Sequence, residues 1–140
     1  MIDIPEERLL KEITDLLMNE LPKVLLEMEE QSKDGIRLPP FRYVGLEEKM
    51  PAGTGLPYAF VEIEEAEYTE KDRIVKNVIY SLKVTTKLSD ISIIWRYITT
   101  LRKILTWANI DIFKISIESA NNKGEIRIKV YSIESREINK

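Results

Sequence analysis

Apolar residues in the N-terminal part of the chain recur at three- and four-residue spacing. This pattern predicts a helix from about Glu6 to Gln31. Pro22 removes an interior hydrogen bond, so the helix should kink or split near Glu20–Leu21. The apolar stripe that we expect in the core consists of Leu9, Leu10, Ile13, Leu16, Leu17, Leu21, Val24, Leu25 and Met28.

A second helical pattern follows the middle of the chain. Ser89 or Asp90 can cap a helix that runs to about Trp107, and Asn109 is expected to stop it because Asn tolerates positive φ. Trp107, at the helix end, is a candidate interface anchor. Its stripe, expected in the core, consists of Ile91, Ile94, Trp95, Ile98, Leu101, Ile104 and Leu105.

Between the two helical patterns, apolar and polar residues alternate along Pro57–Leu88, which predicts one long β-hairpin. Arms at Tyr58–Tyr68 and Ile74–Lys87 flank a polar turn at Thr69–Arg73. At roughly 3.3 Å per residue each arm would reach about 35–45 Å, against about 17–20 Å for a usual strand. A domain of 140 residues cannot easily cover such arms with its own core. We therefore expect part of the hairpin to project or to meet another chain.

The C-terminal part predicts a second hairpin, with alternation over Ile110–Ser119 and Glu125–Ile133 around a turn at Ala120–Gly124. The fold class expected for residues 1–140 is a single α+β domain. Its sheet is mostly antiparallel, and both helices pack on one face. The expected order is helix, long loop, two strands, helix, two strands, followed by a flexible tail at residues 134–140.

The segment 32–57 is rich in Pro and Gly and shows no regular periodicity. Loops of this length are uncommon in compact domains unless they have a function or are disordered, so this one is a candidate contact arm. Phe41–Val44 is a candidate edge strand. Gly53-Thr54-Gly55 is not expected to bind phosphate, because a strand follows it where a P-loop needs Gly-Lys-Ser/Thr and a helix.

Composition narrows the classes of function. The chain has no Cys and no His, which excludes disulfides, thiolate nucleophiles and the commonest general base and metal ligand. We expect a protein that is not an enzyme and that needs no cofactor. A net charge of −3 gives no general attraction to nucleic acid or to an anionic membrane. No apolar run is long enough to span a membrane, and the N-terminus lacks the features of a signal peptide, so we expect a cytoplasmic location.

The densest charged feature is acidic: Glu62, Glu64, Glu65, Glu67 and Glu70. Side-chain alternation places Glu62 and Glu64 on one face of the strand and Glu65 and Glu67 on the other, unless a β-bulge intervenes. The simplest interpretation is a solvated face with cross-strand cations. An electrostatic contact between chains and a Mg²⁺, Ca²⁺ or acid–base site are the alternatives. The candidate cations are Lys71, Arg73, Lys76 and Lys83.

A basic sheet face is a further candidate. Lys114, Arg127 and Lys129 could line one face of the second hairpin together with Tyr131. Aromatic and cationic residues do combine in proteins that bind single-stranded nucleic acid, but the net negative charge of this chain opposes such binding. An ordinary polar face is the preferred interpretation.

Several stretches taken together resemble a known family. They are Leu9–Leu17 with Leu21-Pro22, the approach Leu56–Val61, the alternating arm Val78–Thr86, the helix Ile91–Leu105 and the closing hairpin. In this order they resemble the tail-terminator and tail-completion proteins of long-tailed bacteriophages and prophages. The resemblance implies a homo-oligomeric ring, commonly a hexamer, that caps the finished tail tube and faces the head connector. It also implies no catalysis and a final place in the virion tail.

The leading hypothesis is therefore a structural subunit that forms a ring at the end of a tail tube. Alternatives are a head–tail joining or neck protein, a small module that binds a peptide or single-stranded nucleic acid, and a carboxylate-metal enzyme centred on Glu62–Glu70. The residues expected to contact another subunit or partner are Tyr58, Phe60, Glu62, Glu64, Tyr68, Lys71, Arg73, Lys76, Lys83 and Trp107.

Overall fold

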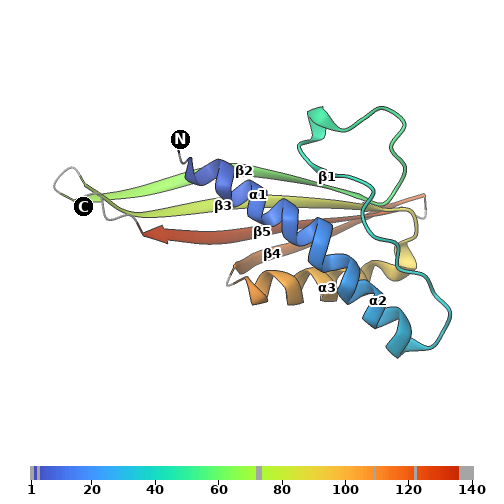
Figure 1. Ribbon diagram of the computed structural model, residues 1–140. Coiled ribbons are helices and arrows are strands. Elements are labelled where there is room, and N and C mark those ends of the chain that lie inside the picture. Colours follow the sequence, from blue (N-terminus) through green and yellow to red (C-terminus); the bar gives the residue numbers. More distant parts are fainter. Residues whose placement is uncertain (1, 3, 72–73, 109, 122, 136–140) are drawn as a thin grey trace.

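The computed structural model describes residues 2, 4–71, 74–108, 110–121 and 123–135; side chains are described for all of these except 69–71, 74–78, 129 and 131–135. A long interrupted helix and a second helix lie on one face of a five-stranded sheet (Figure 1). This arrangement confirms the α+β class and the mostly antiparallel sheet. The described helices leave the other face of the sheet uncovered.

The first helix is interrupted where Pro22 predicts an interruption. It consists of α1 (Pro5–Asp15), a π-helical turn (Leu16–Glu20) and α2 (Leu21–Ser32). The amide of Leu21 donates to the carbonyl of Leu16, five residues back, and Pro22 lies in the first turn of α2. The π turn thus absorbs the break in the hydrogen-bond ladder without ending the helical path. Lys33, with a φ of 53°, ends α2 in the left-handed region.

The second helix begins with a short 3₁₀ turn (Ile91–Ile93) and continues as α3 (Ile94–Trp107). The carboxylate of Asp90 accepts a hydrogen bond of 2.9 Å from the amide of Ser92, which confirms the expected cap. Asn109, the expected stop, lies outside the described residues. Trp95 was expected in the core, and this expectation is wrong: its side chain is 67% exposed. At 100° per residue, Trp95 points away from the buried side of α3.

The sheet has the strand order β1-β2-β3-β5-β4. All neighbouring pairs are antiparallel except β1 with β2. The short parallel strand β1 is an addition to the expected order, and it begins where the candidate edge strand Phe41–Val44 ends. The strands are β1 (Val44–Gly45), β2 (Tyr58–Lys71), β3 (Ile74–Leu88), β4 (Asp111–Ala120) and β5 (Lys123–Ser135). Thus β5 extends two residues into the expected flexible tail.

The core lies between the helices and one face of the sheet. Alternate residues of β3 from Tyr80 to Leu88 are buried, and so are the inward residues of its neighbours β2 and β5. The expected stripe of the first helix packs against them, with Leu10, Leu16 and Met28 only partly buried. The fully buried side chains at the centre of the core include Ile13, Leu17, Leu21, Leu25, Tyr80, Leu82, Val84, Tyr97, Leu101, Ile104, Leu105, Ile126 and Ile128.

The segment 32–57 is anchored to the helices. Asp34 forms an ion pair with Arg96 of α3, and Phe41 packs against Tyr97 with ring centroids 5.9 Å apart. The hydroxyl of Tyr97 donates a hydrogen bond to the carbonyl of Pro39. A 3₁₀ turn at Glu47–Lys49 provides further regular structure. These contacts hold the segment as part of the folded domain.

The hydroxyl of Thr86 generates a prediction about stability. Among the described side chains it is the one buried oxygen without a hydrogen-bond partner, and Thr86 lies in the core row of β3. Replacing this hydroxyl by a methyl group removes the cost of an unsatisfied buried polar group, which is about 1 kcal/mol or more. We expect Thr86→Val to raise the melting temperature by about 3 °C in a thermal unfolding experiment. A lower melting temperature would contradict this account.

Tyr97 generates a second prediction. Burial raises the pKa of its phenol, and the nearby negative charge of Glu29 raises it further. Because the folded pKa lies above the unfolded value of about 10, the folded state retains the proton longer. The contribution of Tyr97 to stability is thus complete below about pH 10 and is lost as the pH rises toward the folded pKa. We expect Tyr97→Phe to lower stability by about 1 kcal/mol at pH 7 and to flatten the decline above pH 10 in denaturant titrations. An unchanged alkaline slope would contradict the assignment.

Candidate interaction surface

The uncovered face of the sheet, here called the open face, is the candidate interaction surface. Cross-strand partners project from the same face of an antiparallel ladder. The register therefore places the open-face residues of β2 beside those of β3: Tyr58 pairs with Lys87, Phe60 with Thr85, and Glu62 with Lys83. The open face continues across β5 and β4 through Glu125, Arg127, Ser116 and Glu118.

A β-bulge in β2 corrects the expected distribution of the glutamates. Ile63 pairs with Leu82 and Glu65 with Ser81, so Glu64 is the extra residue of the bulge. The residues after Glu64 therefore change face relative to simple alternation. Glu62, Glu65 and Glu67 share the open face, and Ala66 faces the helices. The carboxylates gather on one face of the strand where alternation alone predicts that they divide.

Several charged groups of the open face are paired, either across neighbouring strands or, for Arg127 and Glu125, along β5. Lys83 Nζ lies 3.8 Å from Glu62 Oε1. Arg127 Nε lies 3.0 Å from Glu125 Oε1, and Arg127 Nη2 lies 3.6 Å from Glu118 Oε2. The hydrogen bond from Arg127 to Glu125 raises the pKa of Arg127, and the charges of Glu125 and Glu118 raise it further. These pairs support the interpretation of a solvated polar face with cross-strand cations.

One end of the open face carries an aromatic cluster. Phe60 is 7% exposed, because Tyr43 and Tyr58 pack against it at centroid distances of 6.4 and 5.2 Å. Lys87 Nζ lies 5.9 Å from the centre of the Phe60 ring, within reach of a cation–π contact. Beside the cluster is a polar hollow of 230 Å³, whose walls include Glu47, Glu62, Lys83, Lys87 and Arg127. Its charges are of both signs, which gives no preference for an anion or a cation.

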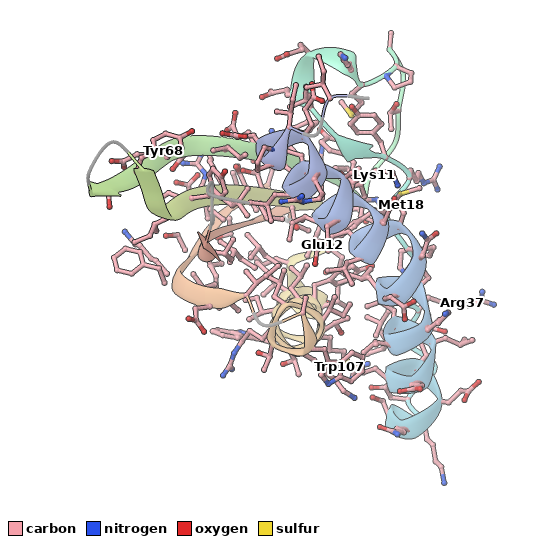
Figure 2. The ribbon with its side chains drawn as sticks, turned by 60° about the vertical axis from the view of Figure 1, so that its left-hand side comes forward. Lys11, Glu12, Met18, Arg37, Tyr68 and Trp107 are labelled. Atoms are coloured by element: carbon pink, nitrogen blue, oxygen red, sulfur yellow. The ribbon has the colours of Figure 1, made fainter. Side chains whose placement is uncertain are left out.

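The ten expected contact residues do not form one patch. Tyr58, Phe60, Glu62 and Lys83 come together on the open face, and Glu64 lies at the adjacent bulge. Tyr68 lies on the helix side of β2, where its hydroxyl donates a 2.8 Å hydrogen bond to Glu6 of α1. Trp107 belongs to α3, is 58% exposed and has Lys103 Nζ 5.0 Å from its ring centre. Figure 2 shows Tyr68 and Trp107 well apart, on different layers of the molecule.

Three of the expected residues lie near the far end of the first hairpin. Lys71 is the last residue of β2, and Lys76 is an extra residue in β3 where the register shifts again. Their side chains are not among those described, and Arg73 lies outside the described residues.

The described residues give limited support to the other candidate sites, which are a metal site, a phosphate loop and a basic sheet face. Within the described residues, no group of three or more acidic side chains could hold a metal ion. Gly53–Gly55 leads to β2, so its amides do not sit at the start of a helix. Lys114 and Arg127 do share the open face, but Glu118 and Glu125 lie there too. No helix in the described part of the chain is long and apolar enough to cross a membrane.

Sequence reasoning predicted the strand that became β4 but not its place at the edge of the sheet, where Phe113 and Ile117 are 62% and 38% exposed. Phe113 is the extra residue of a β-bulge between Ile112 and Lys114. Alternation in 110–119 predicts a strand there, but it does not say that the strand lies at the edge of the sheet.

No family model matches the chain, and no curated protein matches it in sequence.

The aromatic cluster generates a third prediction. Since Phe60 is covered by its own chain, its main contribution is to folding. We expect Phe60→Ala to lower the free energy of unfolding by about 3 kcal/mol. In denaturant unfolding, Glu67→Ala, at an exposed position further along β2, should stay within about 0.5 kcal/mol of wild type. Equal effects of the two variants would show that the ring is not part of the folded core.

Proposed function

We propose that this chain is a structural subunit of a phage or prophage tail. Copies of it form a ring at the end of the tail tube, and the ring joins the tube to the head connector. The role needs no catalysis and no cofactor. The observation that carries the proposal is the length of the β2–β3 hairpin, and the sequence resemblance to tail-terminator proteins supports it.

The hairpin is long for a domain of this size. β2 has 14 residues and β3 has 15, against about 5–6 in a usual strand. β4 begins at Asp111, opposite Tyr131 of β5, which in turn pairs with Ser81 of β3, so β4 does not accompany the part of the hairpin beyond Ser81. The N-terminal end of α1 reaches this part, where the hydroxyl of Tyr68 donates a hydrogen bond to Glu6. The hairpin extends beyond the ends of the helices that lie on the sheet (Figure 1).

The outer edge of β2 offers backbone groups to a partner. β1 pairs only with Ala59 and Phe60, so from Val61 to Lys71 no described strand covers this edge. Unpaired edges of this length are sites where another chain can add a strand. The glutamates of β2 would meet each other if two copies joined through this edge, and like charges placed opposite one another oppose such pairing. A different surface of the neighbouring subunit, or the tube protein, therefore fits the edge better.

The mechanism follows from geometry. A ring requires a contact in which one surface of a subunit meets a different surface of the next. The projecting hairpin supplies a surface that is distant from the α3 side of the domain. When the ring is complete, it occupies the end of the tube and blocks the addition of further tube subunits.

The test uses tail tubes assembled from a purified tail-tube protein. We expect the added chain to form rings at one tube end and to stop elongation, as seen by negative-stain electron microscopy. Replacing residues 69–77 by Asn-Gly connects Tyr68 directly to Val78, its cross-strand partner, through a two-residue turn. This shortened chain should remain folded by circular dichroism and lose the capping activity at least tenfold.

Two outcomes would contradict the proposal. The first is a wild-type chain that leaves tube length unchanged and forms no ring. The second is a folded, shortened chain that caps tubes as well as wild type. Binding to connector particles without any effect on tubes would favour the neck-protein alternative instead.

A further inference from the structure

We propose that two copies of this chain pair through β4, edge to edge and antiparallel, about a two-fold axis at Ser116. The contact goes beyond the proposed ring, because it uses the opposite edge of the sheet and closes after two copies. Four observations carry it: the unpaired edge of β4, the symmetry of its central residues, the sign of its charges and the groove beside it.

The outer edge of β4 is available for pairing. β4 is the last strand in the sheet order, so its second side meets no described strand. Between the bulge at Phe113 and the turn at Asn121, β4 pairs regularly with β5. A regular, unpaired edge with exposed apolar side chains is the structural feature through which strands of two chains join. Here Ile117 is 38% exposed, and Ile115 is partly buried.

The regular part of β4 begins Lys114-Ile115-Ser116-Ile117-Glu118, and this five-residue sequence is complementary to its own reverse. In an antiparallel pair centred on Ser116, Lys114 lies opposite the partner's Glu118 and Ile115 lies opposite the partner's Ile117. A two-fold axis normal to the sheet keeps the open face of both copies on the same side. The charged residues then meet on the open face and the isoleucines meet on the helix face.

Neighbouring registers lack this complementarity. Centring the pair on Ile115 places Lys114 opposite Ser116 and Glu118 opposite Ile112. Centring it on Ile117 places Lys114 opposite Ala120 and Glu118 opposite Ser116. Of these three registers, only the one centred on Ser116 pairs opposite charges, and it does so twice because of the symmetry.

Within one chain, the ladder does not provide these pairs. β5 places Lys129 in register with Lys114, and Glu125 in register with Glu118. Each of the two β4 residues therefore stands opposite a residue of its own sign, which is an unfavourable arrangement. The side chain of Glu118 is 61% exposed even with Arg127 at 3.6 Å. A second β4 strand would supply the opposite charge on the other side of each residue.

The helix side of the same edge contains an open groove of 790 Å³. Its walls are residues 110–115 of β4 and its flank, with Arg102 and Thr106 of α3. Trp95 lies on the same stripe of α3 as Arg102 and Thr106, since the three are separated by seven and four residues. The exposure of Trp95 is therefore on the side of α3 that faces the second copy. Burying apolar area on this side would stabilise the dimer beyond what the short strand ladder contributes.

The first test is a crosslink placed on the axis. Directly opposite residues of antiparallel strands have Cα atoms about 4.5–5.5 Å apart, within the range of a disulfide. The chain has no cysteine, so the thiol introduced by Ser116→Cys can form a disulfide only with the same thiol of another copy. We expect copper–phenanthroline oxidation to convert most of this variant to a covalent dimer on a non-reducing gel. Ser119→Cys is the control, because its Cα atoms would lie about 20 Å apart across the axis; it should remain monomeric.

The second test exchanges the charges. By multi-angle light scattering, wild type should have twice the mass of one chain at high concentration. Lys114→Glu and Glu118→Lys should each weaken the dimer on the order of tenfold or more, because each creates two like-charge pairs across the axis. The double variant K114E/E118K restores both pairs and should restore the dimer. Lys49→Glu, the same charge change away from β4, should leave it unchanged.

Several results would overturn the proposal. They are a wild-type chain that is monomeric at all concentrations, equal crosslinking of Ser116→Cys and Ser119→Cys, and a double variant no better than the single ones. The failure of the ring on tail tubes would leave this contact standing, because the dimer is measured on the protein in solution. Conversely, a monomeric chain that caps tubes would remove the β4 contact alone.

Discussion

The burial of alternate residues of β3 on one side is the constraint on which the rest of the structure depends. Tyr80, Leu82, Val84, Thr86 and Leu88 are all closed off from water by the helices. β3 lies between β2 and β5, so its register sets theirs. A slip by one residue would bring Lys83 and Lys87 into the core, and burying unpaired charges is far more costly than losing any single contact here. The register of three strands is thus fixed by one row of side chains.

The same constraint leaves the second face of the sheet open. The helices cover one side, and the alternation that buries Leu82 necessarily exposes Ser81 and Lys83 on the other. Polar pairs such as Glu62 with Lys83 then occupy the open face at little energetic gain, since both side chains remain partly in water. The open face is therefore a consequence of the core. Its polar side chains add little to stability, so they are available for contacts with another molecule.

The β-bulges at Glu64 and Phe113 modify this simple pattern, and these two lie in strands with an uncovered edge. The bulge at Glu64 moves the following glutamates to the open face, and the bulge at Phe113 takes an aromatic side chain out of the core row of β4. Bulges bend a strand and increase its twist, so they limit how far a second strand can follow the edge. On β4 the bulge leaves Lys114–Ala120 as the stretch where pairing can stay regular, and Lys114–Glu118 lies within it.

Helices and strands could be predicted from periodicity, because burial on one side requires it. Trp95 was misplaced because it follows Ile94 directly, and an extra apolar residue beside a stripe does not reveal on which side of the helix it lies. Strand order, β1 and the bulges could not be predicted, since alternation is the same for every pairing order. For the same reason, the sequence Lys-Ile-Ser-Ile-Glu does not indicate a contact between two copies until β4 is known to be an edge strand. Of the expected contact residues, those near the base of the hairpin lie together on the open face. Tyr68 lies on the helix side of β2 and Trp107 lies on α3, so neither joins them.

The two edge strands of the sheet differ in whether their charges favour pairing with the same strand of a second copy. Glutamates on β2 oppose pairing with another β2, whereas β4 carries charges that attract their own reverse. A two-fold axis at Ser116 reverses the strand directions, so the two hairpins of a pair point in opposite directions. Only one of them can then face a given tube end. A subunit that joins a ring must therefore either leave its β4 partner or carry the second hairpin away from the tube. A contact of one short ladder and two exposed ion pairs is weak enough to open, which suits a pair that forms between free subunits and separates when a stronger surface becomes available.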